Sequence, residues 1–137
     1  MSEMATIDKT TSVFKTLIDS AYDSKPSDWT ADTIDAVQAT IDSLNTGKLR
    51  IMQPGQEGWV HHAWLQKAIL CYFRLSDNIT CPTPFLPYKD KVPSRFSSAE
   101  SLAKYQGRIV PPAHIRYGSY VGKNCVIMPS FINIGAY

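Results

Sequence analysis

Cysteine, basic runs and long apolar runs are all scarce in this sequence of 137 residues. The three cysteines, Cys71, Cys81 and Cys125, are an odd number without the paired spacing of a metal site, which favours reduced thiols in the cytoplasm over a disulfide framework. The N-terminus is polar and lacks the apolar segment of a signal peptide. The net charge is only +2 and no long basic run is present, so nothing indicates a nucleic-acid partner.

The longest apolar run, residues 63–75, is shorter than the ~20 residues that span a bilayer, and it contains Gln66, Lys67 and Arg74. A Gly-rich phosphate loop, a Ser/His/Asp pattern and a helical carboxylate pair are also missing. The composition, 44% hydrophobic and 19% charged, is that of a soluble globular protein. We therefore expect one large domain or two small ones, with no membrane partner.

Three segments have the apolar periodicity of helices. Residues 6–22 and 31–45 are each apolar on one side, whereas residues 63–75 are apolar nearly all round, which is typical of a buried helix. We predict that this third helix is the centre of an N-terminal bundle on which the other two pack. For the second helix the predicted N-cap candidates are Ser27, Asp28 and Thr30, the C-terminal cap is Gly47, and the buried stripe is Ile34, Val37, Ile41 and Leu44.

The segments around the third helix have weaker signals. Residues 49–52 and 59–60 are expected to pair as a small hairpin around the turn residues 53–58. The proline-rich residues 76–98 should form an ordered but irregular linker, pinned by Phe85, Leu86, Tyr88 and Phe96. Ser97 and Glu100 have the spacing of a capping box, which predicts a short helix to about Tyr105 that ends at Gly107.

The last quarter of the chain, residues 108–137, has a period of six. Ile115, Val121 and Ile127 recur at this spacing, which fits short strands stacked in successive coils of a parallel β-helix, with a column of aliphatic residues along the axis. Ile134 breaks the period because it follows Ile127 by seven residues. Either one residue is inserted there or Asn133 takes the inward position, and we favour a phase correction by insertion.

Histidine and cysteine give little evidence of chemistry. His114 lies beside the repeat and is weighed as a general base, although a packing or surface role is the commoner one for such a histidine. His61 and His62 lack partners at metal-ligand spacing. Cys71 and Cys125 are interpreted as small buried hydrophobic residues rather than nucleophiles.

Arg108 is the better candidate for a binding residue. It lies at the junction of the helical part and the repeat, and a guanidinium can hold a carboxylate through two hydrogen bonds, which suits a dicarboxylate substrate. The alternative is an ordinary salt bridge to Asp90 or Glu100. Arg116 is expected to point outward into solvent. The alternative is that it takes part in a binding cleft.

Several short motifs occur in order along nearly the whole chain. The most specific is MPS at 128–130 followed by NIGAY at 133–137. The others are KLR at 48–50, GWVH at 58–61, WLQKA at 64–68, FRLSDN at 73–78, DKVP at 90–93 and GRIVPP at 107–112. Together they resemble tetrahydrodipicolinate N-succinyltransferase of the lysine and diaminopimelate pathway, and the similarity is weakest before about residue 42 and between residues 79 and 87.

The resemblance implies an α+β fold, with an α-rich domain over residues 1–107 and the first coil of a left-handed parallel β-helix over residues 108–137. It also implies a cytoplasmic homotrimer with active sites between subunits. Its reaction is succinyl transfer from succinyl-CoA to the amino group of L-2-amino-6-oxopimelate, without a metal. The substrate-binding arginine of the family's G-R-V-V-P-P motif falls on Arg108.

The family's catalytic acidic residues and its CoA groove belong to coils that follow the motif ending at Tyr137. We therefore expect no catalytic residue in this chain and no transferase activity of the chain alone. The alternative hypothesis is a non-catalytic binding or assembly module that associates through its exposed hexad edge.

Overall fold

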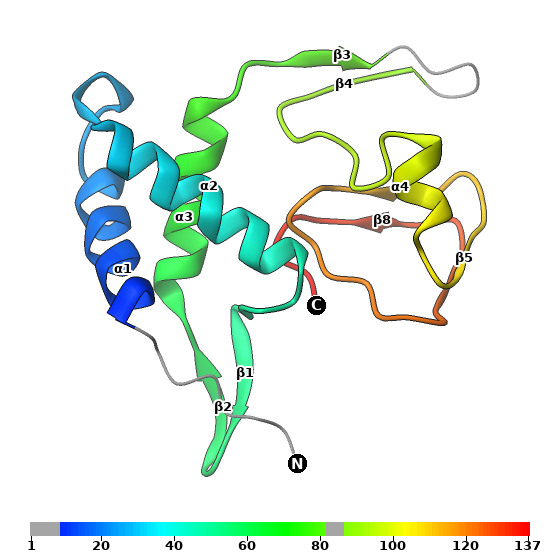
Figure 1. The fold of residues 1–137 in the computed structure, drawn as a ribbon, viewed down its shortest axis with the longest axis horizontal. Coiled ribbons are helices and arrows are strands. Elements are labelled where there is room, and N and C mark those ends of the chain that lie inside the picture. Colours follow the sequence, from blue (N-terminus) through cyan, green and yellow to red (C-terminus); the bar gives the residue numbers. More distant parts are fainter. Residues whose placement is uncertain (1–8, 82–86) are drawn as a thin grey trace.

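The computed structural model describes residues 9–81 and 87–137, and its three long helices lie together on one side of the molecule (Figure 1). They are α1 (Lys9–Tyr22), α2 (Ala31–Asn45) and α3 (Ala63–Leu75), with a 3-10 turn at Pro26–Asp28 before α2. The bounds of α2 and α3 are those predicted, whereas the predicted start of α1 lies outside the described residues. None of the described helices is long and apolar enough to cross a bilayer.

Both ends of α2 follow from its sequence. The hydroxyl of Thr30 accepts a hydrogen bond from the backbone N–H of Thr33, so Thr30 is the N-cap among the three candidates. Gly47 adopts a positive φ of 76°, the conformation in which glycine commonly ends a helix. The predicted stripe is confirmed at Val37, Ile41 and Leu44, which are buried. It is wrong at Ile34, which is 39% exposed.

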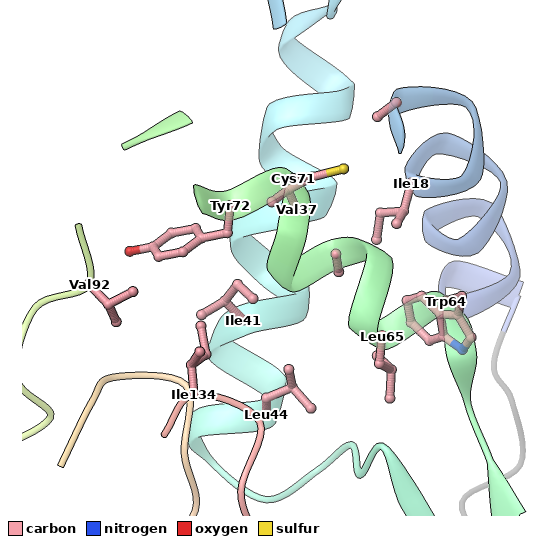
Figure 2. Close-up of a cluster of buried hydrophobic side chains, with 12 residues drawn as sticks. Ile18, Val37, Ile41, Leu44, Trp64, Leu65, Cys71, Tyr72, Val92 and Ile134 are labelled. Atoms are coloured by element: carbon pink, nitrogen blue, oxygen red, sulfur yellow. The ribbon is translucent and has the colours of Figure 1, made fainter. Parts of the chain in front are cut away.

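Helix α3 packs against both α1 and α2, as predicted, and α1 and α2 also pack on each other. Figure 2 shows the resulting core, in which side chains of α3 lie between those of the other two helices. Leu70 is 47% exposed, so α3 keeps one open side despite its apolar sequence. The buried residues of α3 are Trp64, Leu65, Ala68, Cys71 and Tyr72.

The first hairpin is shifted from its predicted position. Strands β1 (Met52–Gly55) and β2 (Gly58–His61) pair antiparallel around a turn of two residues, and nearly all of their residues are exposed. Leu49 and Ile51, which the sequence placed in the first strand, pack instead against the helical core. Their burial explains why pairing begins only at Met52.

The linker is more regular than predicted. Strand β3 (Ile79–Cys81) pairs antiparallel with β4 (Tyr88–Asp90), so the expectation of an irregular segment is wrong there. Of its predicted anchors, Tyr88 and Phe96 are half-buried, and Phe85 and Leu86 lie outside the described residues.

Helix α4 (Ala99–Ala103) follows the linker. Its capping box is formed by Ser98 and Ser101, one residue later than the predicted pair of Ser97 and Glu100. Glu100 pairs instead with Lys104, one turn further along the helix.

The last quarter forms a loop of four very short strands, drawn from yellow-orange to red in Figure 1. Strand β5 (Arg108–Ile109) pairs parallel with β7 (Val126–Ile127), so Arg108 lies opposite a residue 18 positions later. Strand β6 (His114–Ile115) pairs parallel with β8 (Phe131–Ile132), with an offset of 17. Eighteen residues are three hexads, so the predicted period corresponds to parallel pairing between one turn of the chain and the next.

The change of offset shows that the second turn lacks one residue. Ile115 pairs with Ile132, five residues after Ile127, whereas the sequence predicted an insertion that placed Ile134 in the aliphatic column. That prediction is wrong, and Asn133, the alternative inward residue, is exposed. Ile134 is buried in the helical core instead (Figure 2). Its attachment to a different core explains why it breaks the period.

Polar contacts also join residues 108–137, called the coil from here on, to α2. The hydroxyl of Tyr117 donates to Asp42 at 3.0 Å, and the backbone N–H of Gly118 donates to the side-chain oxygen of Asn45 at 3.1 Å. Gly118 has a φ of 83°, and a Cβ at this position would lie 2.8 Å from Ile134 and 3.0 Å from Ile41. The helices and the coil therefore meet too closely for a side chain at residue 118.

Candidate functional site

Arg108 lies at the start of β5, which is on the side of the coil away from the three long helices (Figure 1), and its side chain is exposed. The junction expected for it is thus one of chain order, whereas the helices meet the coil at Gly118 and Ile134. Its backbone N–H donates to the carbonyl of Cys125 at 3.0 Å, which fixes it against the next turn of the coil. The preceding residue is Gly107, where an added Cβ would lie 2.5 Å from that same carbonyl oxygen and 2.6 Å from the ring of Tyr105. The backbone before Arg108 is therefore closely packed, while its guanidinium faces solvent.

Neither of the two salt bridges considered for Arg108 is formed. Asp90 pairs with Arg116, and Glu100 pairs with Lys104. Among the described residues Arg108 has no ion pair and no side-chain hydrogen bond. Its guanidinium thus keeps all of its donors available for an anion such as a carboxylate.

Arg116 has the opposite environment. Its Nε and one terminal nitrogen each donate to a different oxygen of Asp90 at 2.8 Å, and the other terminal nitrogen donates to Asn133 at 2.8 Å. The side chain is only 19% exposed, and the guanidinium lies 5.5 Å from the ring centroid of Phe73 and 5.3 Å from that of Phe131. The expectation of a solvated Arg116 is therefore wrong, because its donors are used within the fold.

The histidines do not form a site. The ring of His114 stacks on Phe131 with centroids 5.9 Å apart and meets the edge of Tyr88 at 4.7 Å, which is the packing role weighed for it. His61 is exposed, and His62 lies 3.3 Å from the side-chain oxygen of Gln53. The described part of the chain contains no cluster of three or more metal-ligating side chains.

Of the cysteines, Cys71 is buried in the helical core as predicted, and burial raises the pKa of its thiol. The prediction is wrong for Cys125, which is exposed. Cys125 lies just before β7, which begins at Val126.

Arg95 is a charged residue that the sequence did not single out. Its guanidinium donates to the backbone carbonyls of Asn45 and Ser119 and to the side-chain oxygen of Asn45. Its Nε is buried without a hydrogen-bond partner among the described residues, and burial lowers the pKa of the guanidinium. Arg95 therefore holds the end of α2 against the coil, a role that depends on tertiary contacts and has no local sequence signal.

Comparison with known proteins finds a matching family model. Residues 13–75, which comprise most of α1 and all of α2 and α3, match the family model described as tetrahydrodipicolinate N-succinyltransferase N-terminal. Over 128 residues the chain is 45% identical to the 2,3,4,5-tetrahydropyridine-2,6-dicarboxylate N-succinyltransferase of Herminiimonas arsenicoxydans, with 88% of this chain and 47% of the relative covered. The chain is therefore similar to the N-terminal part of tetrahydrodipicolinate N-succinyltransferases.

Two further relatives with the same name match this chain with similar identity and coverage. The protein of Alteromonas mediterranea is 42% identical over 129 residues, covering 90% of this chain and 47% of the relative. That of Paraburkholderia phymatum is 44% identical over 128 residues, covering 88% of this chain and 46% of the relative. The chain thus spans about half the length of the curated succinyltransferases that it matches.

Proposed function

We propose that this chain is the N-terminal part of an enzyme that transfers a succinyl group from succinyl-CoA to the amino group of L-2-amino-6-oxopimelate, the opened form of tetrahydrodipicolinate. The carrying observation is the 40–45% identity to curated enzymes named for this transfer over most of the chain. In the reaction the amine nitrogen attacks the thioester carbon, the C–S bond breaks, CoA leaves as the thiol, and the nitrogen loses a proton.

In this proposal Arg108 binds a carboxylate of the substrate. Its guanidinium is exposed and has no ion-pair partner among the described residues, whereas the other arginine of the coil, Arg116, donates three side-chain hydrogen bonds and pairs with Asp90. A carboxylate accepts two parallel hydrogen bonds from such a fork, which recognises its shape as well as its charge.

The same proposal extends to the architecture. The parallel pairs β5–β7 and β6–β8 are taken as the first coil of a left-handed β-helix over residues 108–137, after an N-terminal domain over residues 1–107. By resemblance to the family, the active enzyme would be a cytoplasmic homotrimer whose sites lie between subunits. Completing each site would then require residues from outside this chain.

Deprotonation of the amine needs a base, and the carboxylates nearest to the coil in this chain are committed elsewhere. Asp90 is held by Arg116, Glu100 by Lys104, and Asp42 accepts from Tyr117. We therefore propose that the base and the CoA groove lie in further coils, and that the 137-residue chain has no transferase activity by itself.

The test is an assay of CoA release from succinyl-CoA in the presence of the aminooxopimelate. The full reading frame that contains this chain should release CoA, whereas the 137-residue chain should not. Release by the 137-residue chain would show that the base is within it, and no release by the full-length product would contradict the proposed reaction.

A second candidate function is assembly without catalysis. The outer turn of the coil exposes three large apolar side chains, Val126, Met128 and Phe131, which are 50%, 59% and 59% exposed. Strands β7 and β8 each have one neighbour among the described strands, so their outer edges are available for pairing. Sedimentation of the 137-residue chain separates the candidates, because a monomer at all concentrations would argue against assembly through this edge.

A further inference from the structure

The carbonyl oxygen of Cys125 accepts two hydrogen bonds that link Arg108 to Tyr105. One comes from the backbone N–H of Arg108 at 3.0 Å, and the other comes from the phenol of Tyr105 at 3.3 Å. The same phenol lies 3.2 Å from the carbonyl of Gly122. Tyr105 thus contacts both ends of the turn formed by residues 122–125. At Cys125 it contacts the same carbonyl oxygen that accepts the hydrogen bond from the N–H of Arg108.

The ring of Tyr105 restricts the chain on the other side of Arg108. It fills the space that a side chain at residue 107 would occupy, because a Cβ on Gly107 would lie 2.6 Å from the ring. The ring centroid of Phe96 is 5.1 Å from that of Tyr105, so the tyrosine is itself supported by the linker. Tyr105 therefore packs against Gly107 and also contacts the carbonyl oxygen that accepts from the N–H of Arg108.

The turn opposite Arg108 has little freedom of its own. Asn124 has a φ of 61°, a left-handed conformation that asparagine tolerates better than most residues. Its N–H donates to the carbonyl of Gln106. Burial raises the pKa of Tyr105, so its hydroxyl stays protonated and remains a donor to the two carbonyls at neutral pH.

We propose that Tyr105 is a positioning residue for Arg108: its phenol holds the Gly122–Cys125 turn, and its ring holds Gly107, so that the guanidinium leaves the coil in one direction toward the dicarboxylate substrate. This inference rests on the proposed function of Arg108. Tyr105 does not itself bind the substrate in this account. Preorganisation of the arginine lowers the entropic cost of binding, and it should therefore appear in the substrate KM.

The first test measures the backbone directly in the 137-residue chain. Tyr105→Phe removes only the hydroxyl, and hydrogen exchange at the amides of Arg108 and Asn124 should then become about fivefold faster, as expected for about one lost hydrogen bond. The amide of Gly135, which donates to Gly118 in another part of the coil, is the internal control and should not change. Unchanged exchange at Arg108 in Tyr105→Phe would overturn the proposal.

The matched control variant is Tyr120→Phe. Tyr120 lies in the same coil, its ring contacts Tyr137 at 4.6 Å, and its hydroxyl makes no hydrogen bond within the described residues. This variant should leave exchange at Arg108 unchanged. An equal acceleration in Tyr120→Phe would show a general loosening of the coil and would also overturn the specific role of Tyr105.

The second test uses steady-state kinetics of the full-length enzyme. Tyr105→Phe should raise KM for the dicarboxylate about fivefold with kcat and KM for succinyl-CoA unchanged, and it should add nothing in an Arg108→Ala background. An effect of Tyr105→Phe that persists in the Arg108→Ala background would overturn this inference while leaving the proposed function intact. If Arg108→Ala alone leaves KM unchanged, the proposed role of Arg108 fails, and the positioning role fails with it.

Discussion

Arg116 and Asp90 form a bidentate ion pair with two hydrogen bonds of 2.8 Å that joins the residue after β6 to β4 of the linker. Both side chains are largely buried, at 19% and 17% exposure. This pair uses the carboxylate that was the first alternative partner for Arg108. The two arginines of the coil therefore differ in their surroundings, since Arg116 is paired within the fold and Arg108 has no ion pair among the described residues.

The Asp90–Arg116 pair should make stability depend on pH in the acid range. Burial of Asp90 opposes its ionisation, but hydrogen bonds from Arg116 and from the N–H of Lys91 outweigh burial and hold the pKa of Asp90 below its ordinary value. Because the folded pKa is below the unfolded value of about 3.9, the contribution is present above about pH 4 and is lost as the pH falls through the folded pKa. Urea unfolding at pH 7 and at about pH 3 measures this loss.

Asp90→Asn should lower the free energy of unfolding at pH 7 by about 2 kcal/mol and remove most of that acid dependence. Glu100→Gln is the control because its pair with Lys104 is exposed, at 78% and 75% for the two side chains, and such pairs contribute little. Equal stability of Asp90→Asn and the unmodified protein at pH 7 would contradict the structural role given to the pair.

Gly118 should not tolerate a side chain. Gly118→Ala forces alanine into a φ of 83° and places its Cβ 2.8 Å from Ile134, so we expect a loss of about 2–4 kcal/mol in unfolding free energy. Gly122→Ala is the matched control, because its Cβ would meet only the sulfur of Cys125, at an ordinary 3.6 Å. Thermal unfolding of both variants checks this, and a loss in Gly122→Ala as large as that in Gly118→Ala would refute the steric account.

Ile134 should matter for the helical part as well as for the coil, because it is 6% exposed within the shared core. Ile134→Ala is expected to cost about 2–5 kcal/mol and to lower the protection of α2 amides in hydrogen exchange. Met128→Ala removes a side chain that is 59% exposed and should change stability by less than about 0.5 kcal/mol. Normal protection of α2 in Ile134→Ala would mean that the coil and the helices do not share a core.

Tyr117 should titrate above the ordinary range of a tyrosine. Burial, together with its hydrogen bond to Asp42, raises its pKa to about 12. Because the folded pKa exceeds the unfolded value of about 10, this contribution is complete below about pH 10 and is lost as the pH rises toward 12. Ultraviolet titration curves of the unmodified protein and of Tyr117→Phe should differ by one phenol that titrates near pH 12, and identical curves in that range would contradict the assignment.

The helical part could be read closely from the sequence because its signals are local. Thr30 and Gly47 mark the ends of α2, and the nearly continuous apolar sequence of α3 indicated a helix packed on by the other two. The hairpin of β3 and β4 was missed because prolines dominate the composition around it, although they lie outside its three paired positions.

In the coil and the candidate site, several features depend on tertiary contacts and could not be predicted from local sequence patterns. A period of six indicated parallel coils, but it could not reveal that Ile134 leaves the column to join a second core, since that depends on where α2 lies. In the same way, Arg108 and Arg116 look alike in sequence, and only the position of Asp90 decides which one is paired. The dicarboxylate proposed for Arg108 was inferred from the guanidinium and its place in the sequence, whereas the contacts of Tyr105 with Gly107 and Cys125 depend on the fold.

The most direct test of the central claim is the KM for the dicarboxylate substrate in the full-length enzyme carrying Arg108→Ala. Because Arg108 is exposed and has no ion pair among the residues that the structure describes, the variant should keep its unfolding free energy and its KM for succinyl-CoA. The dicarboxylate KM should rise about 30-fold or more, the equivalent of about 2 kcal/mol for a lost charge-assisted bond. An unchanged dicarboxylate KM would remove Arg108 from the site and contradict the account.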